Sequence, residues 1–219
     1  MSRNMDNEER RRRMVQNQIE ARGVTDERVL EAMRTVPRER FVPSEMRSRA
    51  FGDGPLPIGA GQTISQPYIV ALMAEALELE QGDRVLEIGT GSGYAAAVLA
   101  EVAGEVFTIE RHADLVEQAR SVLADLGYDN VHVRHGDGTL GWQEQAPFDA
   151  IVSAAAGPSV PDSLMSQLAV GGRLVMPVGD KMMHQSLMRV RRTDDGTFES
   201  EDLGAVRFVP LIGEEGFSD

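Results

Sequence analysis

Between residues 69 and 213, short apolar runs alternate with longer stretches whose apolar residues recur at helical spacing. Residues 84–88 (RVLEI) are typical of a buried strand, and residues 113–126 carry the periodicity of an amphipathic helix. The same patterns predict strands at 106–109, 131–133, 148–152 and 173–177 and helices at 69–79, 94–103 and 163–168. Such alternation is typical of βαβ units. The sequence therefore predicts an α/β fold with a doubly wound, mostly parallel, Rossmann-like sheet.

The two ends of the chain follow other patterns. Residues 6–46 are polar and helical in spacing, whereas residues 51–67 are so rich in glycine and proline that we expect an irregular, functional loop. Near the other end, the segments 186–191 and 205–211 flank an acidic turn, which predicts an antiparallel hairpin. We therefore divide the chain into an N-terminal helical region with the loop (1–68), a core (69–213) and a C-terminal tail (214–219).

Composition narrows the class of protein. The chain has 219 residues, 42% of them hydrophobic, and no cysteine, which excludes disulfides, thiolate metal sites and a cysteine nucleophile and favours a reducing, cytoplasmic location. No apolar run of about 18 residues is present, so we expect neither a signal peptide nor a membrane span. The net charge of −13 disfavours nucleic acid as a partner. We interpret the basic run at 10–13 as a solvated helix start, because two glutamates precede it.

A glycine-rich turn joins the strand at 84–88 to the next helix. Residues 85–94 read VLEIGTGSGY, a G-x-G-x-G pattern with Tyr94 where a dinucleotide-binding fingerprint has glycine. Glycines permit a sharp turn and a close approach of a ligand to the backbone. A short glycine run is by itself also typical of a plain tight turn.

Two acidic residues follow the next two strands. Glu110 ends the strand after the glycine loop, where a carboxylate accepts hydrogen bonds from a ribose diol, and Asp137 follows the third strand, where it would meet an adenine amino group. Each acid alone is equally typical of a helix cap or a solvated loop. Because the carboxyl ends of parallel strands meet at one edge, the three features together predict a cofactor site.

Several segments carry a resemblance to a known family. Residues 85–94 are similar to the first motif of class I S-adenosylmethionine-dependent methyltransferases. More narrowly, residues 56–68 (LPIGAGQTISQPY) resemble the signature loop of the protein-L-isoaspartate (D-aspartate) O-methyltransferases. Further matching segments are GDGTLGW at 136–142, APFDAI at 146–151, GGRLV at 171–175 and VRFVPL at 206–211. The resemblance runs from about residue 14 to residue 213.

The resemblance implies both a fold and a reaction. The fold is a sheet of seven strands in the order 3-2-1-4-5-6-7 with the sixth antiparallel. The reaction moves a methyl group from S-adenosylmethionine to the free carboxylate of L-isoaspartyl residues in damaged proteins and leaves S-adenosylhomocysteine. The ester then closes to a succinimide, whose hydrolysis returns part of the population to aspartate.

The resemblance also assigns site residues. Ser65 matches the active-site serine, whose hydroxyl would orient the acceptor carboxylate, although a serine here is also typical of a turn or a cap for the helix after Pro67. The residues that match cofactor-binding positions are Thr63, Ile64, Gln66, Glu87, Gly89, Gly91, Glu110, Asp137 and Gly138. The residues that match a peptide-binding segment are Val209, Pro210 and Leu211, for which a buried edge strand is the alternative.

Other functions remain open at this point. An amino-type nucleic-acid methyltransferase often carries an Asp/Asn-Pro-Pro-aromatic motif where residues 153–156 read SAAA, and a cytosine-C5 enzyme needs a cysteine. A small-molecule O-methyltransferase and a non-catalytic S-adenosylmethionine-binding protein are the two alternatives. The four histidines show no metal-ligand spacing, so we expect them to be ordinary surface or strand residues and expect no metal. We expect a monomer. Ser153 and Gly157 depart from the family pattern, and we expect little loss of function from Ser153 because serine keeps the hydroxyl of the usual threonine.

Overall fold

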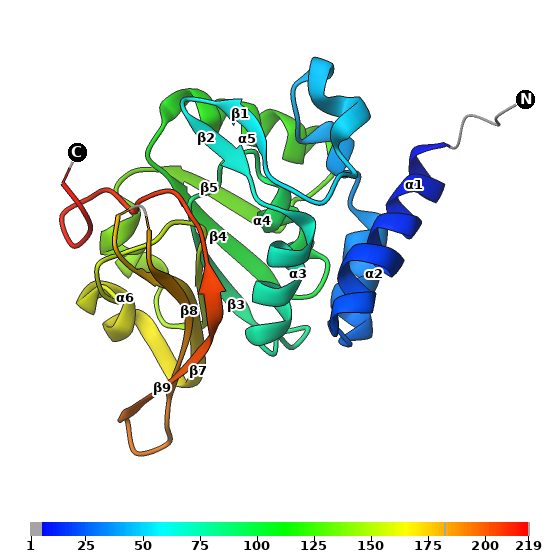
Figure 1. Cartoon of the computed structure of the whole chain (residues 1–219). Helices are drawn as coiled ribbons and strands as arrows, with labels where there is room; N and C mark the ends of the chain where they lie inside the picture. Colours follow the sequence, from blue (N-terminus) through cyan, green and yellow to red (C-terminus); the bar gives the residue numbers. More distant parts are fainter. Residues whose placement is uncertain (1–5, 182, 219) are drawn as a thin grey trace, which may run out of the picture.

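The computed structural model of the chain describes residues 6–181 and 183–218. A seven-stranded sheet lies at its centre, with helices on both faces (Figure 1). In spatial order the strands are β5 (Val131–His135), β4 (Glu105–Glu110), β3 (Arg84–Ile88), β6 (Phe148–Ser153), β7 (Leu168–Gly179), β8 (Gln185–Arg192) and β9 (Phe198–Val206). Counted along the chain this order is 3-2-1-4-5-6-7, and only the sixth strand, β8, runs antiparallel to its neighbours. The predicted fold is confirmed.

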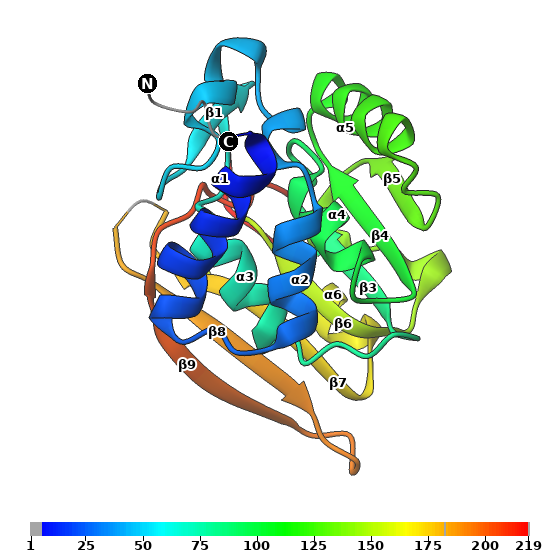
Figure 2. The same ribbon diagram turned by 90° about the vertical axis from the view of Figure 1, so that its right-hand side faces the viewer.

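Helices cover the sheet in layers. The helices are α1 (Asn7–Met14), continued by a π-helical turn (Val15–Ile19) and a 3-10 turn (Glu20–Arg22), α2 (Glu27–Thr35), α3 (Pro67–Ala76), α4 (Tyr94–Ala100), α5 (Ala113–Leu126) and α6 (Asp162–Gln167). Figure 2 shows α1 and α2 side by side as an outer layer over α3. Short 3-10 segments span Arg38–Arg40, Ser44–Arg49, Gly138–Leu140 and Gln143–Gln145. Of the helices that the structure describes, none is long and apolar enough to cross a membrane.

Alternating side chains of the central strands enter two separate cores. In β3, Val85 packs into the cluster shared with α1 to α5, whereas Leu86 packs into the cluster on the α6 side. Both side chains are fully buried, which is why adjacent positions of this strand are apolar and do not alternate with exposed polar residues. The N-terminal helices contribute Met14, Ile19 and Met33 to the first core, so they are built into the same hydrophobic packing as the sheet.

Two local predictions need correction. The second strand of the terminal hairpin was expected at 205–211, but β9 spans Phe198–Val206. Nearly all of its side chains are exposed, because β9 is the outer edge of the sheet, and its polar sequence therefore lacks a strand-like apolar pattern. The loop at 51–67 is not wholly irregular, since it contains a small antiparallel hairpin of β1 (Leu56–Gly59) and β2 (Gln62–Ile64).

The turn of this small hairpin has an unusual backbone. Gly59, Ala60 and Gly61 have φ values of 103°, 49° and 70°, so three successive residues lie in the left-handed region. Glycine adopts this region freely, whereas alanine does so at a cost in energy. The turn therefore needs the two flanking glycines, and it directs the hairpin back over the end of β3.

A fully buried arginine supports the chain on both sides of the hairpin. Arg38 is 0% exposed, and its Nε and Nη2 atoms donate hydrogen bonds of 2.8 Å each to the carbonyls of Ala50 and Ser65. Its guanidinium also lies 4.7 Å from the ring centroid of Tyr94 at the start of α4. Burial lowers the pKa of the Arg38 guanidinium from its ordinary value. One side chain thus ties the segment at 50, the segment at 65 and α4 together.

We expect Arg38→Met to lower the free energy of unfolding by about 2–4 kcal/mol, because two buried carbonyls lose their donor while the volume is largely kept. Urea denaturation of the two proteins measures the difference. The control is Arg40→Met, which removes an exposed arginine paired with Asp125 at 3.6 Å and is expected to cost less than about 1 kcal/mol. Equal losses in the two variants would contradict the role assigned to Arg38.

Candidate active site

Two adjoining hollows lie at the carboxyl edge of the parallel strands. We call the first the glycine-loop cavity; its walls are Gly61, Gln62, Thr63, Ile88, Gly89, Gly91, Ile109, Glu110, Arg111, His112, Gly138, Ala154, Ala155 and Val209 to Ile212. We call the second the serine groove; its walls are Pro55, Thr63, Ser65, Gln66, Ile69, Ala154 and Ala205 to Pro210. The two hollows share Thr63, Ala154, Val209 and Pro210. A ligand in one therefore lies next to a ligand in the other.

The glycine loop forms the floor of the cavity. Gly89, Gly91 and Gly93 have φ values of 92°, 53° and 87°, so each occupies a conformation that favours glycine. A side chain at Gly91 would also lie 3.2 Å from Cδ1 of Ile58, because the hairpin packs directly on the loop. Space as well as backbone conformation thus requires glycine where the cavity is lined by main chain.

Glu110 places a fixed carboxylate in the cavity wall. Its Oε2 accepts a hydrogen bond from the Gly91 amide and its Oε1 accepts one from the His112 amide, both at 2.9 Å. The residue is 5% exposed, so the two backbone amides replace the hydrogen bonds that water would make to an exposed carboxylate. The carboxylate therefore has a set position and retains acceptor capacity for a ligand.

His112 is a cavity residue that the sequence interpretation missed. It precedes α5 and lines the cavity, and its Nε2 atom is buried without a hydrogen-bond partner in the described part of the chain. A buried polar atom without a partner is costly unless a ligand satisfies it. The expectation of an ordinary surface or strand histidine is wrong here. Its position two residues after Glu110 was the available signal.

Glu87 lies beneath the glycine loop rather than in the cavity wall. It is 1% exposed, and its Oε2 accepts a hydrogen bond of 2.6 Å from the Thr108 hydroxyl, which in turn lies 2.6 Å from the Thr90 hydroxyl. Burial, reinforced by the nearby Glu110 charge, raises the pKa of Glu87 to about 8. Its second oxygen has no partner among the described residues. Glu87 is thus a neutral acid at pH 7 that supports the loop from below.

The acid after β5 holds a turn. Gly138 lines the cavity, and a side chain there would lie 2.4 Å from Cγ2 of Ile88. Asp137 is not a wall residue: its Oδ1 accepts hydrogen bonds of 2.8 Å from the amide and hydroxyl of Thr139, and its Oδ2 accepts one of 2.8 Å from the Glu214 amide. The helix-cap alternative is therefore present, and Asp137 also fastens the C-terminal segment beside the cavity.

Ser65 faces the second hollow. Its hydroxyl makes no hydrogen bond within residues 6–181 and 183–218, and it does not cap α3, whose N-cap is Gln66 without a side-chain bond. Gln66 also lines the groove and donates a 2.6 Å hydrogen bond from Nε2 to Oδ1 of Asp53. Ile64, which we expected beside the cofactor, is 4% exposed and packs into the core instead of the walls.

The segment after β9 forms the wall between the hollows. Its Val209 carbonyl accepts a hydrogen bond from the Ala156 amide at 2.8 Å, and its Leu211 amide donates one to the Ala156 carbonyl at 2.7 Å. Val209 and Pro210 line both hollows, whereas Leu211 lines the cavity alone. The segment is thus joined to the chain after β6 by a single isolated β-bridge, and it is not the buried edge strand of the alternative interpretation.

The two departures from the family pattern have structural counterparts. The Ser153 hydroxyl donates a hydrogen bond of 2.8 Å to the Ala155 carbonyl and so turns the chain after β6. Gly157 lies where a side chain would be 2.7 Å from the Ser159 carbonyl oxygen. In the described ranges, no cluster of three or more histidine, aspartate or glutamate side chains is arranged to hold a metal ion.

Comparison with known proteins decides the family. The family model described as protein-L-isoaspartate (D-aspartate) O-methyltransferase matches residues 9–216. The chain belongs to this family. A relative from Rhodopseudomonas palustris strain HaA2, named protein-L-isoaspartate O-methyltransferase 1, is 62% identical over 95% of this chain and 85% of its own. A relative from Marinobacter nauticus, named protein-L-isoaspartate O-methyltransferase 2, is 60% identical over 94% of each chain.

Solved structures agree with this assignment. A protein-L-isoaspartate O-methyltransferase superposes with a TM-score of 0.83 at 30% identity, over 95% of this chain and 67% of its own. A putative protein-L-isoaspartate O-methyltransferase from Plasmodium falciparum, in complex with S-adenosyl-L-homocysteine, has a TM-score of 0.80 at 26% identity, over 95% and 99% of the two chains. The protein is therefore an S-adenosylmethionine-dependent methyltransferase with the Rossmann-like fold of this family.

The raised pKa of Glu87 makes a pH-dependent contribution to stability. Between about pH 4.5 and 8 the folded enzyme holds a proton that the unfolded chain has released, so the contribution is full below pH 4.5 and is lost as the pH rises through 8. Glu87→Gln mimics the neutral acid, and we expect its stability relative to wild type to rise with pH by up to about 1.4 kcal/mol per unit in this window. Urea denaturation at several pH values, with the exposed Glu117→Gln as control, measures this. A pH-independent difference between Glu87→Gln and wild type would contradict the assignment.

Proposed function

We propose that this enzyme transfers a methyl group from S-adenosylmethionine to the free α-carboxylate of L-isoaspartyl residues in polypeptides. The observation that carries the proposal is the junction of the glycine-loop cavity with the serine groove along Thr63, Ala154, Val209 and Pro210. Methyl transfer needs a donor and an acceptor in line with each other, and well-oriented reactants gain about 7–11 kcal/mol over free encounter. The arrangement supports a donor in the cavity and an acceptor in the groove.

The chemistry of the cavity walls fits the donor. S-adenosylmethionine supplies an electrophilic sulfonium methyl group when it is bound. In the proposal, the Glu110 carboxylate accepts hydrogen bonds from the ribose diol, and Gly138 with the turn that Asp137 caps holds the adenine side. Gly89 and Gly91 offer main chain to the methionine end, and Glu87 supports them as a neutral acid. The unpartnered Nε2 atom of His112 supplies a further polar contact.

Ser65 is proposed to orient the acceptor. A carboxylate is ionised at neutral pH, so the nucleophile needs no general base, and the protein's task is placement. The Ser65 hydroxyl lines the groove without a hydrogen bond among the described residues and is therefore available to donate one to the acceptor oxygen that does not react. Thr63 lines both hollows and Gln66 lines the groove, so in the proposal Thr63 lies between the donor and the acceptor and Gln66 lies beside the acceptor.

The polypeptide nature of the acceptor belongs to the same proposal. The wall segment Val209 to Leu211 is main chain held by Ala156, and extended main chain is a common partner for a peptide backbone. A net charge of −13 favours such acceptors over nucleic acids, and we propose that the enzyme acts as a monomer. Sedimentation at working concentration tests the monomer independently of activity.

The deciding experiment offers methyl-labelled S-adenosylmethionine with two peptides that differ only in isoaspartate or aspartate at one position. We expect base-labile label on the isoaspartyl peptide alone, since a carboxyl methyl ester hydrolyses in base. Label on both peptides or on neither, with S-adenosylmethionine binding intact by calorimetry, would overturn the proposed substrate.

Ser65→Ala tests the positioning role. We expect kcat to fall about 10- to 100-fold, because the acceptor carboxylate loses its orienting donor, while the Kd for S-adenosylmethionine stays within about twofold. Steady-state kinetics and calorimetry measure the two quantities. The conservative variant Ser65→Thr keeps a hydroxyl and is expected to retain more turnover than Ser65→Ala. A parallel loss of cofactor affinity would show that Ser65 supports the loop and does not orient the acceptor.

A further inference from the structure

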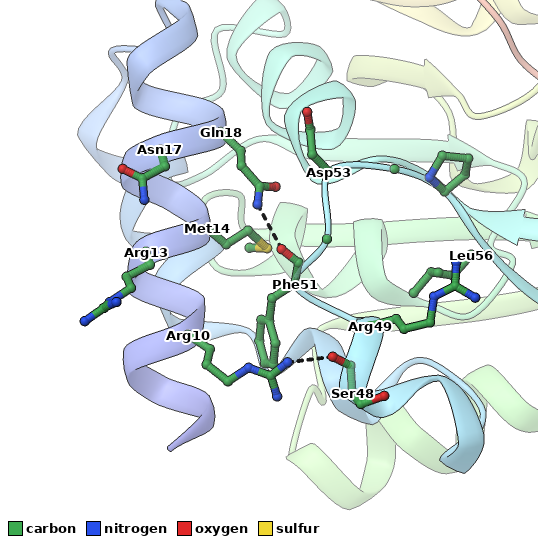
Figure 3. Close-up of a pocket in the computed structure, with 13 residues that line it drawn as sticks. Arg10, Arg13, Met14, Asn17, Gln18, Ser48, Arg49, Phe51, Asp53 and Leu56 are labelled. Carbon is green, nitrogen blue, oxygen red and sulfur yellow. Dashed lines mark hydrogen bonds between the residues drawn. The ribbon is translucent and has the colours of Figure 1, made fainter. Parts of the chain in front are cut away.

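A third hollow lies beside the site, between α1 and the loop that leads to β1. Figure 3 shows Arg10 reaching from α1 and Arg49 from the segment Ser44–Arg49, on either side of Phe51. The floor between them is apolar and consists of Met14, Phe51 and Leu56, all of which are buried side chains. We call this hollow the arginine pocket.

The two arginines lack carboxylate partners. Arg10 donates to the Ser48 carbonyl at 2.6 Å and lies 4.6 Å from the centroid of the Phe51 ring, and Arg49 makes only a 4.0 Å contact with the Met46 sulfur. Neither guanidinium forms an ion pair with any acid in the part of the chain that the structure describes. Two guanidinium charges without a carboxylate partner therefore face the same hollow.

The one acid in the pocket wall is already engaged. Asp53 pairs with Arg22 through a short contact and accepts the 2.6 Å hydrogen bond from Gln66. Its charge is therefore directed away from Arg10 and Arg49 and toward the serine groove side. The third arginine of the wall, Arg13, pairs with Glu9 at 2.8 Å, so the charge inside the pocket that lacks a partner comes from Arg10 and Arg49.

The arginine pocket adjoins the serine groove. Pro55 lines both hollows, and the hydrogen bond between Asp53 of the pocket and Gln66 of the groove forms the boundary between them. Gln66 directly follows Ser65 in the chain. A polypeptide that presents one residue to Ser65 can therefore continue across Pro55 into the arginine pocket.

We propose that the arginine pocket binds an acidic side chain of the polypeptide substrate, a few residues from the isoaspartyl site, and so favours damaged sites in acidic segments. This inference rests on the proposed function of the serine groove. A guanidinium presents a planar pair of donors that matches a carboxylate, and the ring of Phe51 holds the Arg10 guanidinium in place. The apolar floor accommodates the methylene groups of an aspartate or glutamate side chain.

Charge also argues for this occupant. The enzyme repels acidic segments on average, so such a segment needs a local cationic site in order to dock. Ion pairs near a surface act over about 8–10 Å at physiological salt, which confines the attraction to the neighbourhood of the pocket. The pocket therefore affects which isoaspartyl peptides bind, and not the methyl transfer itself.

The test compares two sets of isoaspartyl peptides with wild-type enzyme, Arg49→Glu and Arg47→Glu. One set carries two glutamates at stepped distances on either side of the isoaspartate, and the other carries glutamines in their place. Arg47 is the matched control because it is exposed on the same segment, lies two residues away and does not line the pocket. Methylation gives KM and kcat, and fluorescence anisotropy gives peptide Kd without turnover.

We expect Arg49→Glu to raise KM and Kd for the best acidic peptide by about fivefold or more, with kcat and the glutamine peptides unchanged. Arg47→Glu is expected to leave both peptide sets within about twofold of wild type. Equal effects of the two variants would show that the preference for acidic peptides depends on the overall charge of the enzyme and not on the pocket, and would overturn the proposal. The proposal is also overturned if wild-type enzyme binds the acidic and glutamine peptides equally well. This holds even if inorganic phosphate stabilises wild type and not Arg49→Glu, because the pocket would then bind a small anion and not an acidic side chain.

The two proposals fail in different ways. If wild-type enzyme methylates the glutamine isoaspartyl peptide but shows no acidic preference, the proposed function stands and the pocket proposal falls. If no isoaspartyl peptide is methylated, the proposed function falls. The anisotropy measurement then still decides whether Arg49 selects acidic peptides.

Discussion

The site depends on one buried carboxylate that ties two loops together. Glu110 accepts amide hydrogen bonds from Gly91 in the loop after β3 and from His112 at the start of α5. Loss of either donor would leave a charge with 5% exposure partly unsatisfied, so the two loops are held in a fixed relation. Burial raises the pKa of Glu87 behind it, and the Glu110 charge adds to this rise because a second ionised acid nearby is disfavoured. The site thus favours the neutral form of Glu87 directly behind the glycine loop.

The N-terminal region completes a site that the parallel sheet begins. The glycine loop is open at the edge of the sheet until the β1–β2 hairpin covers it, with Ile58 against Gly91. The hairpin is held from behind by Arg38, whose guanidinium reaches Ala50, Ser65 and the ring of Tyr94. Ser65 is therefore held by a buried residue that packs against Tyr94 at the start of α4, and not by a strand of the large sheet. This explains how a loop rich in glycine and proline holds a defined shape.

The sequence predicted elements well where burial imposes a pattern. Residues 84–88 and 113–126 match β3 and α5 residue for residue, because both have strong apolar signals. The strand β9 was misplaced, since an exposed edge carries no such signal.

In the site, the ends of the predicted strands indicated Glu110 and the glycines of the loop after β3. Arg38 was beyond prediction, because nothing local distinguishes a buried arginine from the solvated ones around it. The position of Asp137 after a strand could not show whether it caps a turn or contacts a ligand, since both roles use an aspartate.

The distribution of charge matters more for this enzyme than its total. Its acceptor is an anion, yet the chain carries a net charge of −13. The outer strand β9 exposes three acidic side chains, which are Glu199, Glu201 and Asp202. Close to the acceptor, by contrast, Arg207 lines the serine groove and Arg49 the adjoining pocket. Screening limits each charge to about 8–10 Å, so an approaching carboxylate responds to these nearby cations once it is within that range. In the function and the pocket that we propose, these local cations favour an approaching carboxylate despite the net negative charge of the protein.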